Sequence, residues 1–179
     1  EISVTDFMPV GKVGASSVEA PHEIHRIVRC ESGSVEVRCA FQPRLDYARA
    51  ETVLAPFKNG VLARGGGYSV TLTAGIGLDV NDGGAEARFS LAAGQEAVFV
   101  MAYGYGRPRR VSCYRTRQQL DLTKAYWMVG GCGRCVSGAR NTLVSAGSRN
   151  TGCGGRGCGR SADLVVAIRV HSRLGSCGT

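Results

Sequence analysis

The sequence predicts an all-β fold: an antiparallel β-sandwich with a C-terminal linker helix and an irregular Gly/Arg/Cys-rich tail. Three observations lead to this prediction. Short runs rich in β-branched and aromatic residues recur at a spacing of roughly 8–12 residues, which is typical of sandwiches and barrels. Clusters of Gly, Asn, Asp and Ser separate these runs. A helical pattern occurs only near residues 116–127.

The clearest predicted strand covers residues 35–41. Every second residue from Val35 to Phe41 is apolar, and the residues between them are Glu36, Arg38 and Ala40. One face of this strand should therefore be buried and the other solvated. The other predicted strands cover residues 2–8, which Pro9 ends, and residues 24–30, 53–55, 60–63, 68–73, 87–91 and 97–101.

Residues 116–127 contain good helix formers, and Leu120, Lys124 and Trp127 fall along one side of a helix. We expect this helix to lead out of the sheet. The predicted organisation is a partial β-sandwich over residues 1–115, a linker helix over residues 116–127, and a tail over residues 128–179 that is out of frame or disordered.

The net charge of the 179-residue chain is +8, but it is unevenly distributed. Residues 1–127 carry 15 Lys and Arg against 13 Asp and Glu, a balance of +2, and the tail carries 7 Arg against one Asp. A nearly neutral body argues against nucleic acid as a partner. No apolar run approaches the roughly 18 residues of a membrane span, so no membrane partner is expected either. Because no secretory leader opens the chain, we expect a cytoplasmic protein that starts inside a larger one.

The tail contains the most specific metal-like motif. Cys132 and Cys135 have zinc-knuckle spacing, and Cys153 and Cys158 follow, separated by four residues instead of two. These four cysteines are candidate zinc ligands, and disulfides are a second reading. Two further interpretations stay open: a disordered natural extension, or the product of GC-rich DNA translated out of frame.

The sequence of the body offers little support for catalysis. His22 and His25 flank a Glu, but zinc-binding histidines on a helix need a spacing of four residues, and these are three apart in a strand-like run. Four carboxylates could in principle supply the acid pair of a glycosidase, although they are more typical of turn and surface positions: Asp6, Asp46, Glu51 and Asp79. We therefore predict no catalytic residue, cofactor or metal ligand in the body.

Several spaced motifs in the body resemble one family. These are Val4-Thr5-Asp6-Phe7-Met8-Pro9, His25-Arg26-Ile27-Val28-Arg29, Pro43-Arg44-Leu45-Asp46-Tyr47-Ala48-Arg49, Ala92-Ala93-Gly94-Gln95 and Thr123-Lys124-Ala125-Tyr126-Trp127. Together they resemble the trehalase-like N-terminal domain of glycoside hydrolase family 15, the glucoamylase and trehalase relatives, over about residues 2–127. The family pattern has Phe at position 45 and Gly at position 48, so Leu45 and Ala48 depart from it.

The resemblance implies a β-sandwich that packs on a catalytic α/α barrel. In the family this barrel cleaves α-glucosidic bonds with a pair of glutamates. Neither the barrel motifs nor the Gly-Ser-Ile-Asp-Trp opening of the domain is present in the sequence, so we expect an incomplete, inactive part of an α-glucosidase. An apolar patch that includes Tyr126 and Trp127 is expected to dock the barrel.

Two alternatives stay open at this stage. The first is a free-standing carbohydrate- or protein-binding module that uses Tyr103, Tyr105 and Tyr114 as stacking rings, although aromatic residues on strands are usually core residues. The second is a zinc-binding interaction protein that uses the cysteines of the tail.

Overall fold

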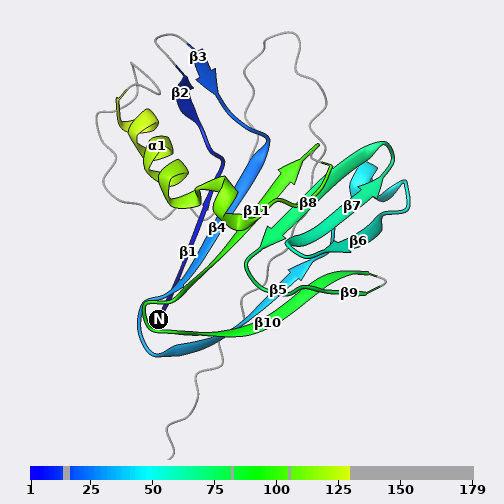
Figure 1. Cartoon of the computed structure of the whole chain (residues 1–179), viewed down its shortest axis with the longest axis horizontal. Helices are drawn as coiled ribbons and strands as arrows, with labels where there is room; N and C mark the ends of the chain where they lie inside the picture. Colours follow the sequence, from blue (N-terminus) through cyan, green and yellow to red (C-terminus); the bar gives the residue numbers. More distant parts are fainter. Residues whose placement is uncertain (14–16, 82, 105, 130–179) are drawn as a thin grey trace, which may run out of the picture.

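The alternating segment predicted from Val35 to Phe41 contributes its apolar face to the core of the observed fold. In the computed structural model, which describes residues 1–13, 17–81, 83–104 and 106–129, Val37, Cys39 and Phe41 are fully buried (Figure 1). Arg38, on the opposite face of the same strand, reaches Glu86 of a neighbouring strand at 2.7 Å. The period-two pattern therefore produces one buried face and one polar face, as predicted.

Antiparallel strands make up most of the described chain. They are β1 (Ile2–Phe7), β2 (Gly11–Val13), β3 (Ser17–Glu19), β4 (Glu23–Cys30), β5 (Ser34–Phe41), β6 (Val53–Phe57), β7 (Gly60–Gly65), β8 (Tyr68–Ala74), β9 (Asp79–Asn81), β10 (Gly84–Ala92) and β11 (Glu96–Tyr103). Short turns of helix cover Leu45–Ala48 and Val111–Tyr114, and α1 covers Thr116–Val129. The predicted strands and the predicted helix are all present.

Within the described residues, the strands form a large and a small sheet and a separate β2–β3 hairpin. The large sheet has the order β1-β4-β11-β8-β7-β6, and the small sheet has the order β5-β10-β9. The core lies between these two sheets, and Val28, Leu72 and Phe99 of the large sheet meet the buried face of β5 there. The predicted antiparallel sandwich is thus confirmed.

Two neighbouring corners carry the chain between the sheets. β4 continues into β5 through Gly33, and β10 continues into β11 through Gly94; both glycines have positive φ, at 73° and 82°. The corners are bonded to each other, because the Gly94 N–H donates to the Cys30 carbonyl at 2.7 Å and the Ala93 N–H donates to the Gly33 carbonyl at 2.8 Å. Figure 1 shows both bends at the same corner of the sandwich, close to the N-terminus.

A second buried layer lies on the outer face of the large sheet. His25, Thr71 and Thr73 alternate with core residues along their strands and are fully buried on this opposite face. The short helical turn Val111–Tyr114 covers them, and the Tyr114 hydroxyl lies 3.3 Å from Thr73 Oγ1. α1 follows directly and packs against β2 (Figure 1). No helix in the described segments is both long enough and apolar enough for a membrane span.

Candidate functional site

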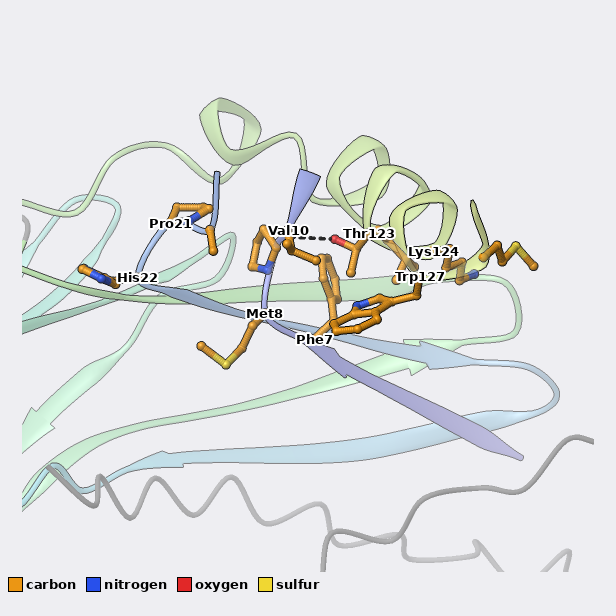
Figure 2. Close-up of a pocket in the computed structure, with 12 residues that line it drawn as sticks. Phe7, Met8, Val10, Pro21, His22, Thr123, Lys124 and Trp127 are labelled. Carbon is orange, nitrogen blue, oxygen red and sulfur yellow. Dashed lines mark hydrogen bonds between the residues drawn. The ribbon is translucent and has the colours of Figure 1, made fainter. Parts of the chain in front are cut away.

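A wide apolar groove separates α1 from the segment that joins β1 to β2. We call it the α1 groove; its volume is about 860 Å³, and its lining residues are Phe7, Met8, Pro9, Val10, Ala20, Pro21, His22, Leu120, Thr123, Lys124, Trp127 and Met128. Figure 2 shows the Trp127 ring facing Phe7 across the groove. Lys124 is the only lining residue among the described ones with a permanent charge, so an apolar surface is the main feature that the groove offers to a ligand.

The sequence builds this groove from the end of β1 and one face of α1. Pro9 stops β1 and is itself fully buried. The chain then turns to the helix, where the Val10 N–H donates to Thr123 Oγ1 at 3.1 Å (Figure 2). Leu120 and Thr123 are buried on the helix face that carries Trp127. The predicted helix face is therefore the one that lines the groove, because a spacing of three or four residues places side chains together.

The rim of the α1 groove carries large exposed apolar side chains. Met8 is 62% exposed, Trp127 58% and Met128 84%. Tyr126, which we expected to share a docking role with Trp127, is half-buried and packs edge-on against the Trp127 ring, with centroids 5.2 Å apart. It is absent from the groove lining. Tyr126 can therefore support Trp127 from the side, while Trp127 presents its own surface to the groove.

A second aromatic group begins at the groove and runs along the end of the large sheet. We call His22, Tyr68 and Tyr103 the aromatic rim. The Tyr103 ring contacts both others, with centroids 6.3 Å from His22 and 6.3 Å from Tyr68. Tyr103 is 44% exposed and Tyr68 is 37% exposed. These rings thus form an exposed surface that the core does not use.

The residues predicted to stack on a sugar have different environments in the structure. Tyr103 is exposed, whereas only 4% of the surface of Tyr114 is exposed and its hydroxyl lies next to Thr73. The ring of Tyr114 is therefore not accessible to a sugar. Tyr105 lies outside the described residues, as do the candidate zinc ligands Cys132, Cys135, Cys153 and Cys158. The zinc site therefore stays a prediction. Tyr68 was not among the candidates, because its place at the start of a strand gave no signal of exposure.

A buried polar cluster lies beneath these surfaces. His25 Nε2 is 3.0 Å from Glu23 Oε2, and Arg109 Nη2 reaches Glu23 Oε1 at 3.2 Å. The Arg109 guanidinium also lies over the Tyr114 ring, 4.6 Å from its centroid. Burial lowers the pKa of His25, an effect that the bond to Glu23 partly opposes. The cluster ties the start of β4 to the segment after β11.

The histidines and carboxylates considered in the sequence do not converge on a reaction site. His25 lies on strand β4, as the strand-like sequence predicted, and the described residues hold no cluster of three or more potential metal ligands. Asp6 binds Arg26 at 2.5 Å, and Asp46 binds Arg49 at 2.6 Å. None of the four candidate carboxylates lines the α1 groove.

These features define a β-sandwich domain with a C-terminal helix and an apolar groove beside that helix. The sequence model of the family "Trehalase-like, N-terminal" matches residues 1–127, which is more than half of the chain, so the chain belongs to this family. No curated protein and no solved structure matched the chain in the corresponding comparisons. Family membership connects the domain to trehalase-type glycoside hydrolases, and it implies association with a catalytic domain in a parent protein.

Proposed function

We propose that this protein is the non-catalytic N-terminal sandwich of an α-glucosidase of glycoside hydrolase family 15, of the glucoamylase or trehalase type, in carbohydrate metabolism. The α1 groove is its docking site for the catalytic α/α barrel. The observation that carries the proposal is the apolar groove beside the helix with which the family match ends. The α-glucoside is a substrate of the parent protein alone.

The exposure of the groove rim supports docking at this position. Met8, Trp127 and Met128 each leave more than half of the side chain uncovered. Contiguous apolar surface of this kind marks a site of protein interaction. Trp127 and Met128 also belong to the last turn of α1, so the groove lies beside the end of the helix. Trp is enriched among the residues that dominate binding energy at interfaces.

The state of the carboxylates supports a non-catalytic role. Inverting glycosidases need a protonated acid and a free carboxylate about 6.5–9.5 Å apart across the sugar. Here Asp6, Asp46 and Glu86 are each paired with an arginine, and Glu23 is buried against His25 and Arg109. The hydrogen bond from Arg38 lowers the pKa of Glu86, whereas a general acid must keep its proton.

A cytoplasmic location is part of the proposal. The cysteines in the described part of the chain, Cys30, Cys39 and Cys113, are free thiols. Free thiols persist in the reducing cytoplasm, whereas small secreted domains usually pair them.

The docking test uses binding of the full chain to a family 15 catalytic barrel supplied as a separate protein. Trp127→Ala is expected to weaken binding about thirtyfold or more, because it removes an exposed aromatic anchor worth about 2 kcal/mol or more. Leu122→Ala is the matched control, since Leu122 is 48% exposed on the same helix and does not line the groove. Equal affinities for the two variants, measured by calorimetry, would contradict docking at the α1 groove.

The second test is hydrolysis by the purified chain alone. Release of glucose from trehalose or maltose should stay at the background of a mock purification. Turnover that co-elutes with the chain through successive chromatographic steps would show that the chain has a catalytic site of its own. That result would refute the non-catalytic role even if the barrel binds.

A further inference from the structure

We propose that the aromatic rim of His22, Tyr68 and Tyr103 is a saccharide-binding site for a neutral α-glucoside. The site shares His22 with the α1 groove, and it rests on the proposed function only for the choice of an α-glucoside as the sugar. Figure 2 shows His22 and Trp127 at opposite ends of the α1 groove. A ligand on the rim therefore leaves the Trp127 end free for a docked domain.

The strand register places the two tyrosines on one face of the large sheet. Tyr103 of β11 pairs with Val70 of β8, and Tyr68 lies two residues from Val70, so all three side chains point to the same side. Val70 lies in the core and is only 1% exposed. The two tyrosines lie on the same face but nearer the end of the sheet, where they are exposed. Ile24 is 39% exposed and belongs to the same face, because its partner Met101 is two residues from Tyr103.

Backbone hydrogen bonds hold the rim in place. The Tyr103 N–H donates to the His22 carbonyl at 2.9 Å, and the Gly104 N–H donates to the Ser69 carbonyl at 2.9 Å. These two bonds tie the end of β11 to the segments that carry His22 and Tyr68. Gly104 makes the second bond with φ at 80°, a conformation that suits glycine. A ligand therefore meets rings on a fixed backbone, which lowers the entropy lost on binding.

The chemistry of the rim matches a pyranose. Each of the three side chains has an apolar ring and a polar atom that can exchange hydrogen bonds. A pyranose has the complementary design, with an apolar C–H face and hydroxyl groups around its edge. Hydrophobic stacking can thus combine with hydrogen bonds at the ring edges, as small-ligand sites require.

The charges beside the rim favour a neutral ligand. Arg26, on the same face of β4 as Ile24, is paired with Asp6, whereas Glu23 lies on the opposite face of β4 with His25 and is bound by Arg109. These charges largely compensate each other, so they offer little long-range attraction to an anionic or cationic partner. A hydroxyl-rich neutral sugar has no net charge to compensate.

The test is a calorimetric titration of the full chain with maltoheptaose and with trehalose. Tyr103→Ala and Tyr68→Ala should each raise the Kd of the sugar that binds by about five- to tenfold, from the loss of one stacking ring. Trp127→Ala is the control and should leave this Kd unchanged. Circular dichroism of each variant verifies that it is folded.

A second measurement needs no variant. On addition of the same sugar, NMR amide shifts should change at His22, Tyr68 and Tyr103 more than at Trp127. The proposal is overturned if neither sugar binds at millimolar concentration, or if binding is insensitive to both tyrosine variants. A further result would also overturn it: the chain binds no sugar but self-associates, and Tyr103→Ala abolishes the self-association. The rim would then be a protein interface. None of these results bears on barrel docking, which Trp127→Ala tests.

Discussion

Three consecutive residues with left-handed backbone are the most unusual local feature of the domain. Asp46, Tyr47 and Ala48 have φ of 50°, 56° and 61°. Left-handed geometry costs roughly 1–2 kcal/mol for each residue that has a Cβ. The turn is held by Arg49, which contacts the Asp46 carboxylate at 2.6 Å and donates its backbone N–H to the Asp46 carbonyl at 3.0 Å. Leu45, which is only 4% exposed, anchors the turn in the core.

Ala48→Gly is therefore expected to stabilise the protein by about 1 kcal/mol, because glycine relieves the penalty of positive φ. The family pattern described above has glycine at this position. Urea unfolding measures the change. Ala50→Gly is the matched control: Ala50 does not have positive φ, so glycine there should destabilise the fold by adding freedom to the unfolded chain. A loss of stability in both variants would contradict the prediction.

The buried imidazole of His25 predicts a pH dependence of stability. Its folded-state pKa is lowered by burial, while the unfolded chain has a pKa near 6.5. As the pH falls below about 6.5, the unfolded state takes up a proton that the folded state resists, so stability decreases by at most about 1.4 kcal/mol per pH unit. Glu23 bonds His25 directly, and the rings of Phe7 and Tyr114 contact it.

Urea midpoints at pH 7.5 and 5.5 test this expectation, since the free energy of unfolding should be lower at the acidic pH. His25→Gln should reduce the difference between the two pH values, because it removes the titrating group. A free energy of unfolding that stays constant or rises toward pH 5.5 would refute the effect.

At the scale of elements, one hydrogen bond ties α1 to the segment that joins β1 to β2. Thr123 is only 7% exposed, and its hydroxyl accepts a hydrogen bond from the Val10 N–H at 3.1 Å. Removal of the acceptor leaves a partly buried N–H unpaired. Thr123→Val should therefore destabilise the domain by about 1 kcal/mol, while Thr123→Ser should retain most of the stability. Thermal unfolding of the two variants compares them, and a more stable Thr123→Val would exclude a stabilising role for this bond.

Some patterns in the sequence were sufficient to predict individual strands and the helix. Strong alternation predicted β5 correctly, and the spacing of Leu120, Lys124 and Trp127 predicted the face of α1 that lines the groove. Strands β2, β3 and β9 were missed, because three residues are too few to display a period.

The site residues were harder to predict than the elements. Whether Tyr114 is buried and Tyr68 exposed depends on which segment covers each face of the sheet. Tyr114 belongs to a turn that folds back over Thr73, a contact between residues 41 positions apart. No local pattern encodes such a contact. The left-handed turn at Asp46 was also missed, because Tyr47 and Ala48 rarely adopt positive φ.

At the scale of the whole molecule, the two sheets share one core, and Phe41 is fully buried in it. Phe41→Ala should destabilise the fold by about 3–5 kcal/mol, a large share of the roughly 5–15 kcal/mol that holds a domain together. Phe57→Ala is the control, since Phe57 is 37% exposed at the end of the edge strand β6, and it should cost less than about 1 kcal/mol. Similar losses in calorimetric melting would disprove a shared core centred on β5.

The order of the large sheet affects how the protein is made. β11, the last strand of the described chain, lies between β4 and β8 and joins them. During synthesis, we therefore expect the β1–β4 pair and the β6–β7–β8 meander to keep unpaired edge strands until β11 has been translated. Bare edges invite pairing between nascent chains. Slow translation over residues 74–103 should therefore lower the yield of soluble protein, and a chaperone that shields these edges should restore it.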